Sequence, residues 1–281
     1  MKKLLLVAAM ALFTVGASAQ INTPAPSPFA KVEQVVGLTE VSLEYSRPAM
    51  RGRTIFGDLV PYGKIWRTGA NQRTKITFST DFTVGGKELK AGTYAIFTKP
   101  EASSWTVYFY TEYQGGGAPR EWDDSKVAAM VNVPVQRMPM DIESFTMTFD
   151  DLKNDGANLG ILWENAYVGV PFGVPTDDAV SAQIEKVMKG PGAGDYYTAA
   201  VYMANNGKDI NTAKEYMDKA MSMIEKPAFW QLRQQSLIQA KSGDKKGAIA
   251  TAKASLAGAK EAKNADYIKL NMDSLKEWGG L

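Results

Sequence analysis

Apolar and polar residues alternate along much of the chain between residues 32 and 170. Val41, Leu43 and Tyr45 alternate with polar neighbours, and the same period of two returns at residues 145–149. This period is typical of strands with one buried face. Turn-forming glycines separate the runs and no long amphipathic helix intervenes, so we predict seven or eight short strands in an antiparallel β-sandwich. The strand-like runs are 41–45, 74–80, 81–84, 92–99, 105–111, 145–149 and 159–170.

The pattern becomes helical after a stretch rich in proline and glycine at residues 171–175. Thr176 and the two aspartates after it are typical of a helix N-terminus. Gly190-Pro191-Gly192 is expected to end this helix, and further helical spacing follows. We therefore predict a β-sandwich domain over residues 20–172, a linker and first helix over 173–194, and a helical domain over 195–281.

The helical region contains a weak repeat. Residues 204–220 align with residues 240–255, so that Gly207 falls opposite Gly243, 36 residues later. This spacing resembles that of tetratricopeptide repeats, which have a period of about 34 residues. A peptide-binding repeat array and a plain helical bundle both fit, because such arrays normally need about three repeats or more. Residues 266–278 are predicted to form a final helix.

The first 19 residues have the features of an export signal. Lys2 and Lys3 precede an apolar run over residues 4–15, and Ala17-Ser18-Ala19 fits the specificity of a signal peptidase. We expect cleavage near Ala19 and a soluble periplasmic or secreted protein that begins at Gln20. No later apolar run reaches the roughly 18 residues of a membrane span.

The composition excludes several classes of chemistry. The chain contains neither cysteine nor histidine, which rules out disulfides, thiol nucleophiles, Ser-His-Asp triads and most zinc sites. Without the two signal lysines, the 32 basic residues become 30, equal to the 30 acidic residues. This balance argues against general nucleic-acid binding, and we predict no metal and no cofactor.

The segment from Tyr45 to Lys75 concentrates arginine and aromatic residues, and Asp58 is its only acid. About 27 of these residues show no sustained period, and long ordered loops are often functional. Guanidinium groups bind carboxylate or phosphate through paired hydrogen bonds, and aromatic faces stack on sugar rings or on cations. We therefore predict an anion- or sugar-binding site formed by Tyr45, Arg47, Arg51, Arg53, Tyr62, Trp66, Arg67 and Asn71.

The same residues also fit a purely structural role. Arginine side chains often hold long loops by donating to backbone carbonyls. On this interpretation the apolar residues of the segment form the loop's own small core. They are Ile55, Phe56, Leu59 and Val60.

A second candidate chemistry lies in an acidic stretch after a glycine-rich loop. Glu121, Asp123 and Asp124 offer carboxylates, and glycoside hydrolysis needs two carboxyl groups that flank the scissile bond. A solvated acidic loop is the alternative interpretation. The hypothesis that competes with binding is therefore a carboxylate-dependent hydrolase that acts on envelope glycans.

Several motifs resemble a known family. YSRP at residues 45–48, RGRTIFG at 51–57, LVPYGKIWRTGAN at 59–71 and AGTYAIFTKP at 91–100, followed by Trp105, are similar to the signature of a secreted bacterial family known as domain of unknown function 2911. The likeness covers about residues 27–171. The resemblance implies no established activity, cofactor or catalytic residue. It also implies that a helical, repeat-like C-terminal extension is common.

These observations favour a non-catalytic binding protein over an enzyme. We expect the β domain to recognise an anionic or carbohydrate ligand or an envelope partner, and the helical domain to bind a protein partner. We expect neither a nucleic-acid partner nor a membrane span.

Overall fold

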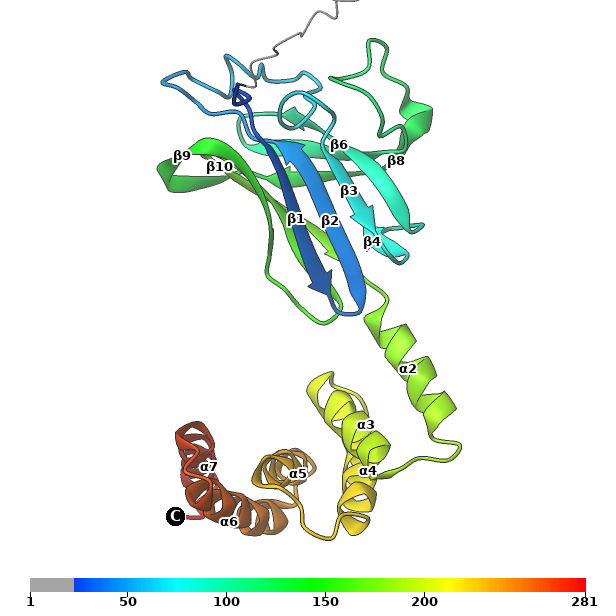
Figure 1. The fold of residues 1–281 in the computed structure, drawn as a ribbon, viewed down its shortest axis with the longest axis vertical. Helices are drawn as coiled ribbons and strands as arrows, with labels where there is room; N and C mark the ends of the chain where they lie inside the picture. Colours follow the sequence, from blue (N-terminus) through cyan, green and yellow to red (C-terminus); the bar gives the residue numbers. More distant parts are fainter. Residues whose placement is uncertain (1–22) are drawn as a thin grey trace, which may run out of the picture. The chain divides into compact units, whose positions relative to one another are not determined.

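A computed structural model describes residues 23–281, so the expected export signal and the mature N-terminus at Gln20 lie outside the described residues. The chain divides into two compact units between Thr176 and Asp177. Strands make up the first unit and helices the second (Figure 1). The fold class predicted from the sequence, a β domain followed by an α domain, is confirmed.

The first unit consists of two antiparallel sheets. One sheet has six strands in the order β1-β2-β3-β6-β7-β8, and the other has four in the order β5-β4-β10-β9. A short 3-10 helix, η1, precedes β8. The bounds are β1 Phe29–Val36, β2 Thr39–Ser46, β3 Lys75–Phe78, β4 Phe82–Val84, β5 Lys87–Leu89, β6 Gly92–Pro100, β7 Ser104–Tyr110, η1 Asp124–Lys126, β8 Val127–Pro134, β9 Gln136–Asp150 and β10 Gly156–Gly173.

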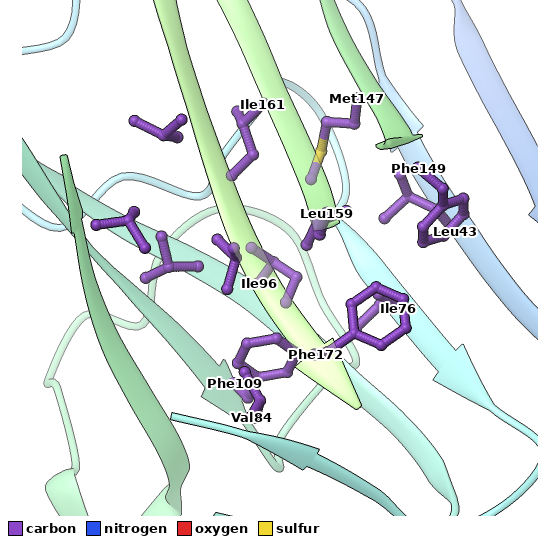
Figure 2. Close-up of a cluster of buried hydrophobic side chains, with 14 of the residues drawn as sticks. Leu43, Ile76, Val84, Ile96, Phe109, Met147, Phe149, Leu159, Ile161 and Phe172 are labelled. Atoms are coloured by element: carbon purple, nitrogen blue, oxygen red, sulfur yellow. The ribbon is translucent and has the colours of Figure 1, made fainter. Parts of the chain in front are cut away.

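The core of this unit lies between the two sheets. Along β2 the apolar residues are buried and alternate with more exposed polar ones, as strand geometry requires of a sheet with one buried face. Figure 2 shows side chains from both sheets meeting in one cluster, among them Leu43, Ile76, Met147 and Leu159. Each fully buried side chain of this kind stabilises the fold by about 1.5–3 kcal/mol relative to exposure. The arrangement is the β-sandwich that the sequence predicts.

The strands differ from the prediction in number and length. β1, β5 and β8 are not among the predicted runs, and β9 and β10 extend to 15 and 18 residues. Much of the N-terminal half of β9 is exposed, so its sequence lacks the alternation that burial imposes. The pairing of β10 with β9 also shifts register around Glu164, which breaks the period of two.

The long connection between β2 and β3 is held by pairing and by burial. Ala49 forms an isolated bridge with Ser144 of β9, and Trp66 forms one with Thr98 of β6. The connection also contributes three buried side chains to the sandwich core, those of Ile55, Phe56 and Val60. The expectation that Leu59 belongs to a small loop core is wrong, because this side chain is 44% exposed.

The second unit is built from helices that pack in sequence order. α3 packs on α4, α5 on α6, and α6 on α7. No helix within residues 23–281 is both long enough and apolar enough to cross a membrane. The bounds are α2 Thr176–Val187, α3 Ala193–Asn205, α4 Ile210–Ser222, α5 Phe229–Lys241, α6 Lys245–Glu261 and α7 Ala265–Glu277.

The two aligned segments of the repeat have matching turns. Gly207 follows α3 and Gly243 follows α5, and both have positive φ (66° and 89°), a conformation that glycine adopts without steric cost. Asp209 and Asp244 then cap the N-termini of α4 and α6 by accepting backbone N–H groups. Each half of the repeat is thus a helical hairpin with the same stop and start signals.

Candidate functional site

A pocket of about 410 Å³ is formed largely by the connection between β2 and β3. Its volume lies in the range of small-molecule sites. Three arginines line it, and its described lining contains no aspartate or glutamate. The lining residues are Pro26, Ser27, Pro48, Ala49, Arg51, Arg53, Leu59, Val60, Trp66, Arg67, Gly69, Ala70 and Trp163.

Two tryptophans form an aromatic wall of the pocket. The rings of Trp66 and Trp163 are stacked, with centroids 5.9 Å apart and planes inclined by 18°. Trp163 is buried and Trp66 half-buried. The ring of Phe145 packs edge-on against Trp66 at 5.3 Å, and the Trp163 indole N–H donates to the carbonyl of Glu143 at 3.2 Å. These contacts fix Trp66 while part of its surface stays accessible.

Arg67 is the least satisfied cation of the pocket. Its Nε is buried, and it has no hydrogen-bond partner within residues 23–281. A buried N–H without an acceptor costs about 1–3 kcal/mol, and more when the group is charged. Arg67 also lines the pocket.

Arg73 lies six residues away and has several hydrogen-bond partners. Its guanidinium donates to the carbonyls of Glu112 at 2.6 Å and of Gly117 at 3.2 Å, and it forms an ion pair with the Glu112 carboxylate. It also lies 5.6 Å from the centroid of the Phe97 ring. Arg73 is therefore held by several acceptors, in contrast to the Nε of Arg67.

The backbone just after Arg67 adopts an uncommon conformation. Thr68 has φ 56°, which is a steric outlier for a β-branched residue. Gly69 has φ 134°, and a Cβ atom there would lie 3.0 Å from the carbonyl oxygen of Ser46. The Thr68 hydroxyl donates to Thr98 Oγ1 at 3.1 Å, which helps to hold this turn. Strained backbone that the surrounding structure maintains is concentrated at functional sites.

Arg51 and Arg53 add charge at the rim of the pocket. Arg51 donates from Nη2 to the Pro26 carbonyl at 2.8 Å, and Arg53 donates to the carbonyls of Met50 and Ala49 at 2.9 and 2.7 Å. Both side chains are exposed. They hold the loop backbone, as the structural interpretation expects, and they also place positive charge in the pocket lining.

Arg47 and Tyr45 hold the connection against β9 and are not among the residues that line the pocket. Arg47 donates to the Phe145 carbonyl at 3.0 Å and to the Thr146 hydroxyl at 2.8 Å. Tyr45 is only 4% exposed, and its hydroxyl hydrogen bonds with both backbone groups of Met147. Tyr45 is therefore a core residue with no exposed face to offer a ligand. The prediction included Tyr45 because its aromatic face lies next in sequence to the arginine-rich segment.

Asn71 and Tyr62 lie at the margin of this arrangement. Asn71 has φ 58° and donates from Nδ2 to the Ser27 carbonyl at 3.1 Å and to Ser46 Oγ at 3.2 Å. It therefore positions Ser27, which lines the pocket. Tyr62 is 36% exposed and its ring lies close to Gly57, where a Cβ atom would approach it to 2.9 Å.

Three residues from distant strands shape the pocket and were not predicted. Trp163 of β10 supplies half of the aromatic wall, and its sequence context reads only as a buried strand. The carboxylate of Glu164 accepts from the backbone N–H groups of Ile55 and Phe56 at 3.2 and 3.3 Å. Glu143 accepts from the backbone N–H of Arg51 at 2.9 Å. Their contacts depend on strand pairing across the sandwich, which no local motif encodes.

Residues 27–172 match the model of the family described as Protein of unknown function (DUF2911). This chain belongs to that family. Neither a curated protein nor a solved structure matches it. The match begins at Ser27 in the pocket lining and ends within β10, so the DUF2911 domain contains every lining residue except Pro26.

The acidic stretch of the DUF2911 domain serves local structure. Asp123 accepts from the backbone and hydroxyl of Ser125 and caps η1, and these hydrogen bonds lower the pKa of its carboxyl group. Asp124 accepts from the indole N–H of Trp122 at 2.8 Å. A general acid for glycoside hydrolysis requires a raised pKa, so the shift at Asp123 does not favour that role.

The described part of the chain, residues 23–281, contains no group of three or more acidic side chains arranged to hold a metal ion. The DUF2911 pocket presents three guanidinium groups and a stacked pair of tryptophans.

Proposed function

We propose that the DUF2911 domain is a non-catalytic binding domain that holds a small anionic ligand in the arginine-lined pocket. A sugar acid is the class that suits it best, because such a ligand combines a carboxylate with a ring that can stack on Trp66. The observation that carries this proposal is that Arg67 lines the pocket while its guanidinium Nε has no acceptor within the described residues.

The charge of the pocket supports an anion. Arg51, Arg53 and Arg67 contribute three guanidinium groups, and no carboxylate among the described lining residues offsets them. A guanidinium binds a carboxylate through two parallel hydrogen bonds, which gives orientation as well as affinity. The contact with a charged partner contributes on the order of 1.5–3 kcal/mol.

The proposal includes an extracytoplasmic location and a second binding role. Residues 1–19 have the sequence features of an export signal, which supports a periplasmic or secreted protein. The helical unit is proposed as a tetratricopeptide-like scaffold for a protein partner. Its two hairpins with matching glycine and aspartate turns support this, as does the half-exposed side chain of Trp230 on α5.

A paired ligand screen tests the proposed anion site. The chain from residue 20 onward would be melted in the presence of glucuronate or glucose, galacturonate or galactose, and N-acetylmuramate or N-acetylglucosamine. We expect an acid to raise the melting temperature and its neutral counterpart to have little effect, since a ligand at about 100 times its Kd adds roughly 2.7 kcal/mol of stability.

A matched pair of variants controls the screen. Arg67→Ala is expected to abolish the shift. Arg137→Ala is expected to retain it, because Arg137 is an exposed arginine that hydrogen bonds with Asn165 and Ala102 outside the pocket lining. Equal shifts from acids and neutral sugars, or no shift from any acid, would contradict the proposal.

A further inference from the structure

The edge strands of the two sheets differ in how they are protected from pairing with another strand. β9 is covered by the connection after β2, since Met50 donates to the carbonyl of Glu143 and Phe145 donates to that of Pro48. β5 has only three residues. Along β8, Gly85 approaches so closely that a Cβ atom would lie 3.0 Å from the carbonyl oxygen of Met130.

β1 is the exception. It is eight residues long, lies at the end of the six-stranded sheet and pairs with β2 alone within the described residues. An edge strand of this length leaves a row of backbone N–H and C=O groups unpaired and is a template for another strand. Natural proteins rarely leave such an edge both long and apolar.

The exposed face of β1 is partly apolar and carries one charge of each sign. Phe29 is 66% exposed and Val35 58% exposed, and Lys31 and Glu33 lie between them on the same face. Lys31 and Glu33 form an exposed ion pair at 2.5 Å. The other face, with Ala30 and Val32, packs against the core.

This order of residues is self-complementary. Residues directly opposite in an antiparallel pair share a face of the sheet. A two-fold axis at Val32 sets Lys31 opposite Glu33 of the second copy and Phe29 opposite Val35. An axis at Lys31 or at Glu33 would instead set two like charges opposite each other, which is unfavourable.

We propose that β1 is a homodimer interface, in which two copies of this chain pair their β1 strands antiparallel about Val32. The pairing joins two six-stranded sheets into one continuous sheet. It satisfies the free backbone groups of both edges, covers Phe29 and Val35 of each copy, and leaves the arginine-lined pocket uninvolved. The register follows from charge, because only the axis at Val32 sets unlike charges opposite each other.

Charge reversal tests this interface. Molar mass would be measured by sedimentation equilibrium on the chain from residue 20 onward, up to about 0.5 mM, a range that covers the weak affinity of a small interface. The native chain is expected to dimerise. Lys31→Glu and Glu33→Lys are each expected to weaken dimerisation by about tenfold or more, since symmetry places the repulsive pair in the interface twice.

Mixing the two variants gives the decisive result. The Lys31→Glu chain and the Glu33→Lys chain have opposite charges at both positions, so an equimolar mixture is expected to form a heterodimer with near-native affinity. Lys153→Glu, an exposed charge reversal outside β1, is expected to dimerise like the native chain. Melting temperatures would confirm that every variant is folded.

A native chain that stays monomeric over this range would overturn the proposal, as would single variants that dimerise as tightly as the native chain. Failure of the mixture to recover the dimer would overturn the register about Val32. None of these results depends on the ligand pocket, so they leave the proposed function to its own test.

Discussion

At the scale of single residues, the arginines between Tyr45 and Lys75 differ in what their guanidinium groups contact. Arg47 and Arg73 donate to carbonyl and hydroxyl groups of other segments, so their cost of burial is compensated by hydrogen bonds. Arg67 is the exception, because its buried Nε has no partner within residues 23–281. The contrast separates the arginines that hold the fold from Arg67, which we propose to bind a ligand.

A comparison of Tyr45 with Tyr62 tests whether the Tyr45 hydroxyl stabilises the fold. Tyr45→Phe removes a buried hydroxyl that hydrogen bonds with both backbone groups of Met147, so we expect a loss of about 1–2 kcal/mol in the free energy of unfolding. Tyr62→Phe changes a partly exposed side chain and is expected to stay within about 0.5 kcal/mol of native. Urea unfolding measures both. Similar costs for the two variants would show that the Tyr45 hydroxyl has no special structural role.

The sequence could predict which residue types lie near the pocket, but it could not predict which residues of distant strands they contact. The clustering of Arg51, Arg53, Trp66 and Arg67 follows from their proximity along the chain. Trp163 lies nearly 100 residues later in a strand whose pattern indicates burial only, and its ring stacks on Trp66 in the folded domain. Local spacing reports which face of an element is buried, whereas the contact itself depends on pairing between distant strands.

At the scale of elements, β9 and β10 are joined by a side-chain contact that depends on glycine. The Tyr167 hydroxyl donates to Asp150 Oδ2 at 3.1 Å. A Cβ atom at Gly160 would lie 2.2 Å from that same oxygen and 3.1 Å from the Tyr167 ring. Gly160 therefore leaves the space in which the tyrosine lies over the strand pair. Burial, followed by the nearby Asp150 carboxylate, raises the pKa of Tyr167 to about 12.

The raised pKa of Tyr167 predicts a loss of stability in alkali. Its pKa is about 10 in the unfolded chain and about 12 in the folded one, so the folded state retains the proton more tightly. The contribution of Tyr167 to the free energy of unfolding is therefore fully present below pH 10 and declines as the pH rises from 10 to 12. Urea unfolding at pH 9 and pH 11.5 would show a smaller decline for Tyr167→Phe than for the native chain. Equal declines would contradict the assignment to this tyrosine.

Strands with one buried face were predictable, and strands with little burial were not. β2 and β7 alternate because one face of each packs on the core. The N-terminal half of β9 is largely exposed, so the sequence there carries no period of two. β5 has only three residues, too few to establish a period.

At the scale of the whole molecule, the chain consists of two compact units that meet between Thr176 and Asp177. The β unit has its own extensive core between the sheets. The helical unit has separate apolar clusters, one around Ala213 and Met217 and one around Ala252 and Leu275. A unit with its own core can fold independently.

Separate expression tests this independence. Residues 20–176 and residues 177–281 would each be produced alone and melted, with circular dichroism as the readout. We expect a cooperative transition from each fragment, because the core of each unit is formed within it. A fragment that melts without cooperativity would show that its core depends on the other unit.

The central claim is that Arg67 binds the anionic group of a ligand, and calorimetric titration tests it most directly. The acid that raises the melting temperature most would be titrated into the native chain, Arg67→Lys and Arg137→Lys. Lysine keeps the charge but loses the planar pair of donors. We therefore expect Arg67→Lys to weaken affinity by about ten- to a hundredfold, with an unchanged melting temperature of the free protein, and Arg137→Lys to bind like the native chain. Native affinity in Arg67→Lys, or unfolding of the β domain by this substitution, would show that Arg67 does not bind the anionic group.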